Sequence, residues 1–217
     1  MLERIRETLS GSQSAKLATA VLFPAFLTSC GHSPAESLQA RYKEKNSISA
    51  FLVCSEYSCS TEQWVSLSET EWSQVRSNFL PAPLSAPDER ERIRRAVAMM
   101  ENLVGPKIGT DIDRAGAAIF TLDKRGQLDC IDEAYNTTTY LRFMDSDNLI
   151  QYHQIGEPAR RGYILNRWPH NTATVIEHDT GASYAVDSWF GANGALPDVV
   201  SLQSWLDGWS PEASSPS

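Results

Sequence analysis

The sequence has little positive charge and only a short hydrophobic run at its N-terminus. Among 217 residues, 19 Lys and Arg stand against 27 Asp and Glu, which gives a formal net charge of −8. Nucleic-acid-binding domains normally carry a basic face, so the composition argues against a DNA or RNA partner. The apolar run at 17–27 is shorter than the roughly 20 residues that a membrane-spanning helix requires, so no transmembrane anchor is expected.

The N-terminus has the pattern of an export signal. Arg4 and Lys16 precede the apolar run, and Leu-Thr-Ser-Cys ends it at Cys30. This ending resembles a bacterial lipobox, in which the cysteine is lipidated and becomes the mature N-terminus. We therefore predict a lipoprotein signal peptide over 1–29 and a lipid anchor on Cys30 that holds the domain at a bacterial membrane, facing the periplasm or the exterior. A cytosolic protein with an apolar N-terminal helix is the alternative.

Cysteine is scarce, with four residues in the chain. Once Cys30 is assigned to the lipid, Cys54 and Cys59 form the natural disulfide pair in an oxidising compartment. A zinc site would need two further ligands, which do not occur at finger spacing. Cys130 is then left unpaired, and an unpaired thiol in an exported protein is expected to be either buried or used.

Composition divides the rest of the chain. The segment 30–84 begins as a polar tether, and the prolines at 81–87 mark the expected start of the core. We predict a catalytic domain over 85–208. The Ser- and Pro-rich tail at 209–217 is expected to be disordered.

Three helices are predicted from capping signals and apolar spacing. Ser68 followed by Glu71 forms a capping box before one helix. A second, amphipathic helix starts near Asp88, carries an arginine-rich solvated face and stops at Gly105-Pro106. The third runs from Cys130 to about residue 143.

The third helix points to thiol chemistry. A helix N-terminus stabilises a thiolate, so the pKa of Cys130 is expected below its ordinary value of about 8.5. Asp129, as N-cap, and Asp132, in the first turn, oppose this effect. An imidazolium partner is therefore needed.

His170 is the preferred partner among four histidines. It opens a strand that pairs, through a turn at 178–181, with a strand at 183–189; another strand is expected at 163–165. A two-residue turn places Asp187 opposite Thr172, on the same face as His170 and a diagonal step of ~7–8 Å away. Asp187 would then orient the imidazole.

The other histidines fit less well. His32 lies in the tether and His178 in the turn, whereas His153 stays open as an alternative partner.

Four segments resemble the transglutaminase-like superfamily, and more narrowly the bacterial transglutaminase-like cysteine peptidases. They are Leu-Asp-Cys-Ile-Asp-Glu-Ala at 128–134, Gly-Glu-Pro-Ala-Arg at 156–160, Pro169-His170, and Tyr-Ala-Val-Asp-Ser-Trp at 184–189. The first matches the family pattern Asp-Cys-x-Asp-x-Ala. The resemblance covers about residues 88–207 and implies a papain-like α+β fold, with the nucleophile helix packed on an antiparallel sheet that carries His and Asp.

The resemblance also bears on cofactors and the oxyanion site. Some exported relatives bind calcium through acids that flank the nucleophile; Asp129 matches one of them, but Ile131 replaces the other. No cofactor or metal is therefore assigned, and calcium stays open. Gln127 and Trp168 are the candidates for an oxyanion donor.

These features predict a cell-envelope lipoprotein with Cys130, His170 and Asp187 as catalytic residues, acting on protein or peptide as a cysteine peptidase or amidase. A true transglutaminase that uses an amine acceptor is one alternative. Another is an inactive scaffold or peptide-binding lipoprotein. A redox thiol is disfavoured because Cys130 has no neighbouring resolving cysteine.

Overall fold

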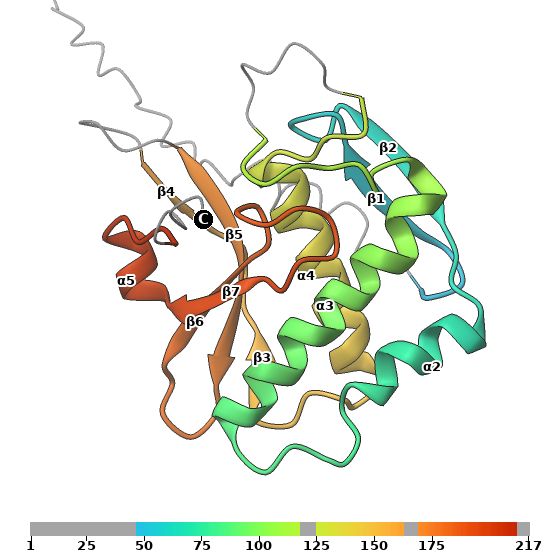
Figure 1. Ribbon diagram of the computed structural model, residues 1–217. Helices are drawn as coiled ribbons and strands as arrows, with labels where there is room; N and C mark the ends of the chain where they lie inside the picture. Colours follow the sequence, from blue (N-terminus) through green and yellow to red (C-terminus); the bar gives the residue numbers. More distant parts are fainter. Residues whose placement is uncertain (1–46, 118–124, 163–168, 212–217) are drawn as a thin grey trace, which may run out of the picture. The chain divides into compact units, whose positions relative to one another are not determined.

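The computed structural model describes residues 47–117, 125–162 and 169–211. In these ranges the chain combines helices with antiparallel strands, as expected for an α+β protein (Figure 1). The elements are β1 (Phe51–Ser55), β2 (Thr61–Val65), α2 (Glu69–Ser77), α3 (Ala86–Ile108), α4 (Cys130–Ser146), β3 (His153–Ile155), β4 (Ala159–Arg161), β5 (His170–Glu177), β6 (Ser183–Asp187), β7 (Asp198–Ser201) and α5 (Leu202–Leu206). The predicted signal peptide with Cys30, the strand at 163–165, Trp168 and the end of the tail lie outside the described residues.

The larger sheet has the strand order β3-β5-β6-β7, and β4 pairs with β5 as well. All of these pairings are antiparallel. In the β5–β6 hairpin Ala173 faces Val186 and Ile176 faces Ser183, which is the register that the two-residue turn predicted. The register therefore puts the end of β6 beside the start of β5, where the site residues lie.

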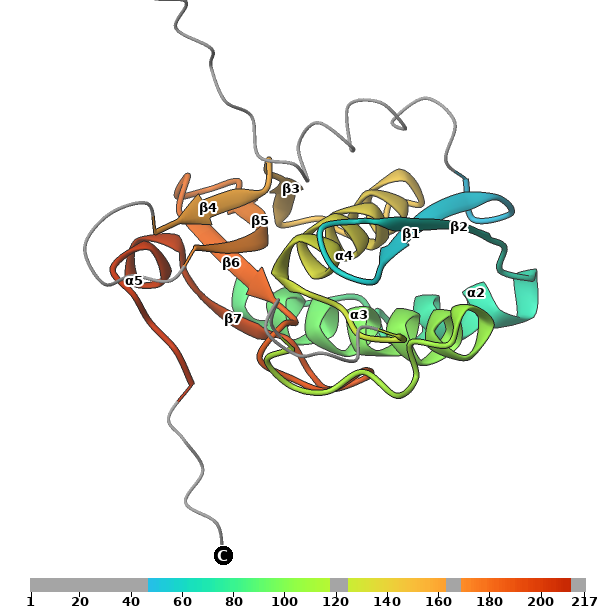
Figure 2. The same ribbon diagram turned by 90° about the horizontal axis from the view of Figure 1, so that it is seen from above.

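Helix α4 packs against β5, β1 and α3. Figure 2 shows it lying between the larger sheet and the β1–β2 hairpin, with α3 alongside. The central Thr137, Thr138 and Thr139 are buried although threonine is a weak helix former. Thr138 donates to the Ala134 carbonyl at 2.6 Å and Thr139 to the Tyr135 carbonyl at 3.0 Å, so the buried hydroxyls are satisfied within the helix.

The core starts earlier in the chain than the prolines suggested. Strand β1 is buried throughout, and the Phe51 ring packs edge-on against Tyr140 and Phe143 of α4. The same buried cluster takes in Trp72 of α2 and Val175 of β5. The expected core boundary near residue 85 was therefore wrong, because the prolines at 81–87 separate only α2 from α3.

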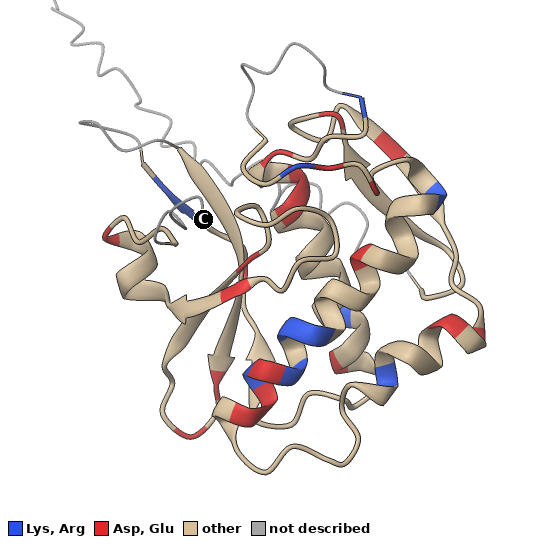
Figure 3. Cartoon of the chain, viewed as in Figure 1, with Lys and Arg blue, Asp and Glu red and all other residues tan. Residues whose placement is uncertain are grey.

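Helix α3 is longer than predicted, since it continues through Pro106 to Ile108. A proline in the last turn removes a single backbone donor, and Gly109 closes the helix with φ 79° and an N–H bond to the Gly105 carbonyl at 2.8 Å. Acidic and basic residues alternate along its N-terminal half, as Figure 3 shows, and Arg94 pairs with Glu91 there. None of the helices in the described ranges is both long and apolar enough to cross a membrane.

Candidate active site

Cys130 is the first residue of α4, and its helix start is fixed by two aspartates. The Asp129 carboxylate accepts from the backbone N–H groups of Ile131 at 2.9 Å and Asp132 at 3.0 Å. The Asp132 carboxylate accepts in return from the Asp129 N–H at 3.1 Å. This reciprocal capping box confirms the predicted helix start and holds the thiol at the N-terminal end of the helix.

His170 and Asp187 form a buried pair. The ring Nε2 of His170 lies 2.6 Å from Asp187 Oδ2, and the Trp205 indole N–H donates to that same oxygen at 2.7 Å. The Trp189 backbone N–H donates to the other oxygen, Oδ1, at 3.3 Å. Asp187 is thereby held by hydrogen bonds at both oxygens, while His170 Nδ1 is buried with no hydrogen-bond partner among residues 47–117, 125–162 and 169–211.

Aromatic rings enclose the imidazole of His170. Ring centroids of Trp189, Phe190 and Trp205 lie 4.7, 5.2 and 5.4 Å from that of His170. Trp189 is itself anchored by its indole N–H, which donates to the Ala117 carbonyl at 2.7 Å. The rings restrict rotation of the imidazole and keep Nε2 on Asp187.

The sulfur of Cys130 contacts β5, the strand that begins with His170, at the following residue, Asn171. Asn171 Nδ2 lies 3.6 Å from Cys130 Sγ and donates toward it. Within the described residues, no hydrogen bond joins the sulfur to the His170 ring. The structure thus brings His170 and Asp187 into direct contact and places Cys130 against Asn171, a residue that the sequence analysis did not single out.

The thiol of Cys130 is less acidic than an ordinary cysteine. Burial raises its pKa to about 11, and the negative charges of Asp129 and Asp187 add to the shift, whereas the hydrogen bonds from Asn171 oppose it. The predicted lowering of this pKa was wrong, because burial of the sulfur disfavours the charged thiolate more than the hydrogen bonds from Asn171 favour it. Cys130 is therefore a neutral thiol near pH 7, and its reaction requires a base.

A disulfide-closed turn supports the aspartates of the site. Cys54 and Cys59 form a disulfide, and residues 56–59 between them, named here the 56–59 turn, have φ between 54° and 68°. A run of left-handed residues other than glycine is unfavourable by itself. Its N–H groups converge on the helix start: Ser58 donates to Asp129 at 2.8 Å, and Tyr57 and Cys59 donate to Asp132 at 2.9 and 2.6 Å. The carboxylates thus stabilise a strained turn, and the turn fixes the carboxylates.

These contacts decide against a cation at the acids flanking Cys130. Both oxygens of Asp129 accept backbone N–H groups, from Ile131 and Asp132 on one side and from Ser58 on the other. Hydrogen-bond donors that point at a carboxylate occupy the positions a calcium ion would need. The sulfurs that lie near Asp132 are joined to each other in the disulfide. Neither calcium nor zinc fits this arrangement.

A second group of acids lies buried around α4. Burial raises the pKa of Glu101 to about 8 and that of Asp113 to about 7, and it raises the pKa of Glu133 well above its usual value. Glu101 accepts from the Gly194 N–H and Asp113 from the Leu128 N–H, both at 2.8 Å. These acids therefore fix the loops on either side of the site.

The remaining candidates from the sequence lie away from the sulfur or outside the described residues. The Gln127 amide donates to the Ile112 carbonyl at 3.1 Å and accepts from the Arg114 N–H at 3.3 Å, so it braces a loop. His153 is buried with Nδ1 on Glu89 at 2.8 Å and Nε2 3.1 Å from Arg90, which makes it a structural histidine. His178 is exposed in the β5–β6 turn.

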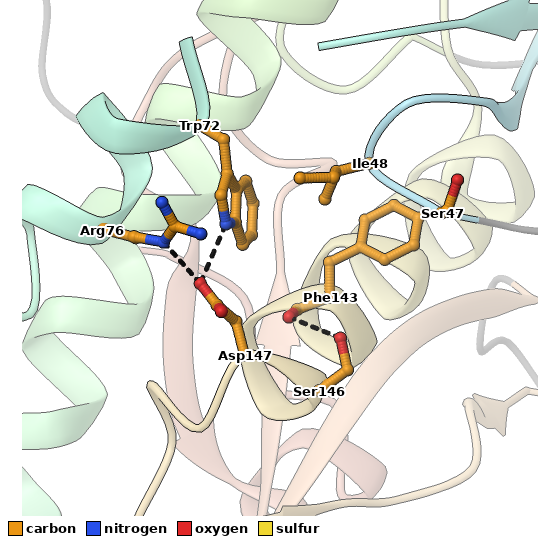
Figure 4. A pocket seen from close by; sticks show the side chains of 7 residues that line it. All are labelled: Ser47, Ile48, Trp72, Arg76, Phe143, Ser146 and Asp147. Carbon is orange, nitrogen blue, oxygen red and sulfur yellow. Dashed lines mark hydrogen bonds and ion pairs between the residues drawn. The ribbon is translucent and has the colours of Figure 1, made fainter. Parts of the chain in front are cut away.

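A small pocket opens at the opposite end of α4. Its volume is about 250 Å³, and Trp72, Arg76 and Asp147 line it together with Ser47, Ile48, Phe143 and Ser146 (Figure 4). The Trp72 indole N–H and the Arg76 guanidinium both donate to Asp147 Oδ2, at 2.9 and 2.6 Å. The charged groups of this pocket, Arg76 and Asp147, pair with each other. Cys130 is therefore the candidate for the chemistry of the chain.

Comparison with known proteins found no match among protein-family models, curated proteins or solved structures. The fold and the site define a mixed helix-and-sheet protein with a partly buried free cysteine against Asn171, the residue that follows the histidine of a His-Asp pair. The likeness to the transglutaminase-like superfamily rests on the sequence motifs alone.

Proposed function

We propose that this protein is a cysteine-dependent acyl-transfer enzyme with a papain-like, transglutaminase-type core, acting as a peptidase or amidase. One observation carries the proposal. In the part of the chain that the structure describes, the buried His170–Asp187 pair leaves His170 Nδ1 without a partner, at the start of the strand whose next residue contacts the Cys130 sulfur. A buried polar atom without a partner is costly in a folded protein, and a catalytic role accounts for it.

The proposed mechanism starts from the protonated thiol of Cys130. Because the pKa of Cys130 is raised to about 11, the S–H proton passes to His170 Nδ1 as the sulfur attacks an amide carbonyl. Asp187 keeps the Nε2–H of the ring oriented and stabilises the imidazolium. The imidazolium then protonates the leaving amine, and a water molecule deprotonated by His170 hydrolyses the thioester, which restores the thiol.

The Cys130 backbone N–H is suited to bind the oxyanion that forms on attack. It is the first amide of α4, and in the described part of the chain no acceptor pairs with it. Unpaired amides at a helix N-terminus stabilise negative charge. The same thioester could pass to an amine, so a transglutaminase is the close alternative.

A non-catalytic scaffold is the rival from a different class, and the buried sulfur favours it. A thiol whose pKa is about 11 reacts slowly on its own, as a purely structural cysteine would.

We further propose, from the sequence of residues 1–30 alone, that the chain is exported and lipid-anchored at Cys30 in a bacterial envelope.

A peptidyl electrophile separates enzyme from scaffold. A peptidyl chloromethyl ketone should alkylate Cys130 of the full chain at pH 7.5, as read by intact-mass spectrometry, and the rate should fall at least a hundredfold in His170→Ala because the base is lost. His178→Ala, which changes an exposed histidine of the turn after the same strand, should react like the wild type. Equal rates in wild type and His170→Ala, together with no cleavage of a mixed peptide library, would falsify the proposed enzyme. Adding a primary amine to the library assay separates hydrolysis from transamidation.

A further inference from the structure

Asn171 has an environment that packing alone does not explain. It is 4 % exposed, and Oδ1 of its amide is buried with no hydrogen-bond partner among the described residues. Its Nδ2 points at the Cys130 sulfur at 3.6 Å. A side chain kept for stability would have both ends of its amide satisfied, as in Asn136, whose amide bonds the N–H and the carbonyl of Cys54.

Two neighbouring residues at the start of β5 share this property. Among the described residues, His170 Nδ1 and Asn171 Oδ1 are both buried without hydrogen-bond partners, and Asn171 is the residue that contacts the sulfur. Unsatisfied buried groups are few in folded proteins and concentrate where chemistry takes place. Their adjacency therefore marks this end of the strand as part of the reacting site.

The electrostatics of the sulfur create a need for a donor at this position. When the proton leaves, negative charge forms on Sγ near Asp129 and Asp187, both of which repel it. The side-chain amide and the backbone N–H of Asn171 are the groups that oppose these acids. A neutral N–H donor stabilises an anion without adding a titrating group.

We propose that Asn171 is a catalytic residue that donates from Nδ2 to the Cys130 sulfur and stabilises the thiolate formed as the proton moves to His170 Nδ1. No bond other than S–H breaks in this step, and the proton is conserved between sulfur and imidazole. The catalytic role of Asn171 rests on the proposed function, but its hydrogen bond to the sulfur can be tested without substrate turnover.

The test is the pH profile of Cys130 alkylation by iodoacetamide, measured on the full chain with its disulfide intact. Asn171→Ala should move the profile up by about one pH unit, so that alkylation at a fixed pH below the midpoint is roughly tenfold slower. Asn171→Asp should move it further, because a carboxylate replaces the donor. Thr174→Val is the matched control, since it removes a side-chain donor from the same strand, one that bonds the Glu157 carbonyl at 2.8 Å; its profile should overlie the wild type.

The outcomes are distinguishable. Profiles of Asn171→Ala and Asn171→Asp that both overlie the wild type would overturn the inference, whatever the enzyme does with peptides. A shifted profile in a chain that cleaves no peptide would uphold the hydrogen bond and refute the proposed function instead. If alanine at this buried position unfolds the protein, Asn171→Leu, which has a similar size and no donor or charge, decides the question alone, and in an active enzyme kcat should fall with KM unchanged.

Discussion

At the scale of single residues, Trp205 holds the Asp187 carboxylate and the His170 ring in place. It is fully buried, its ring packs on His170, and its indole N–H donates to the carboxylate oxygen that holds the imidazole. The Arg161 guanidinium lies 4.5 Å from the centre of the indole and also donates to the Trp205 carbonyl, so the ring is held from behind. The indole N–H is therefore a fixed part of the His-Asp pair.

Trp205→Phe removes this N–H and keeps an aromatic ring in place. Hydrogen bonds to charged groups contribute ~1.5–3 kcal/mol, so we expect kcat to fall about tenfold or more in a peptide-cleavage assay. Trp209→Phe, a change at a ring that contacts Phe190 but not His170, should leave kcat within about twofold. Equal losses in both variants would show that the indole N–H has no specific role.

A single residue could be predicted from the sequence where composition or spacing distinguishes it from other residues of its kind. Cys130 stood out as the unpaired cysteine, and Asp187 followed from strand register, which depends only on alternation and turn length. Asn171 could not be found, because no local pattern distinguishes a strand asparagine that faces a thiol. The shift of the Cys130 pKa was also out of reach, since it depends on burial by segments far away in the chain.

At the scale of elements, the 56–59 turn and the start of α4 form one unit. The left-handed turn is held between the disulfide and the carboxylates of Asp129 and Asp132. Neither side is stable in this form alone, because the turn is strained and buried carboxylates require donors. The geometry around Cys130 therefore depends on the β1–β2 hairpin.

Replacing both cysteines, Cys54→Ser with Cys59→Ser, should lower the free energy of unfolding by about 2 kcal/mol, as expected for a short loop. Urea unfolding measures this change. The backbone amides of Ile131 and Asp132 should also exchange faster with deuterium in the native state, because Asp129 loses part of its support. The control is Ser60→Ala, which removes a side-chain bond within the turn but none to the aspartates. Unchanged exchange at the helix start would contradict the coupling.

Long helices and hairpins could be predicted from the sequence, whereas short strands could not. Helix α4 and the β5–β6 hairpin carry long patterns with caps or turn residues. Strands β3 and β4 have three residues each, which is too few for a periodic signal. They form because β6 pairs with one edge of β5 and leaves the other edge, along which β3 and β4 pair in succession. Strand β1 is buried on both faces, so it shows no alternation at all.

At the scale of the whole molecule, buried acids set the response to pH. Folding raises the pKa of Glu101, Asp113 and Glu133 above the unfolded values near 4. The folded state thus binds protons more tightly than the unfolded chain, so this contribution to stability is complete below about pH 4 and is lost as pH rises through about 7–8. Surface acids such as Asp88 and Asp147 have lowered pKa values, and their contribution is lost only as pH falls below about 4.

The free energy of unfolding should therefore be highest near pH 5 and fall by a few kcal/mol toward pH 8, on the order of 1.4 kcal/mol per unit of pKa shift. Urea unfolding at the two pH values measures the difference. Glu133→Gln removes one buried titrating group and should flatten the fall, whereas Asp111→Asn, at an exposed acid, should not. Stability that rises from pH 5 to pH 8 would refute the assignment of these acids as protonated.

The contacts of the 56–59 turn also have a consequence for the order of folding. The turn precedes the aspartates it holds by 71 to 75 residues, so its hydrogen bonds close a long loop of chain. Contacts of such long range form late, because the entropy of loop closure is lost before they can stabilise anything. Helix α4 can form from its own sequence, but its first turn acquires its final geometry only when the hairpin docks. The surroundings of Cys130 are thus completed in one of the last steps of folding, after the core that encloses them has formed.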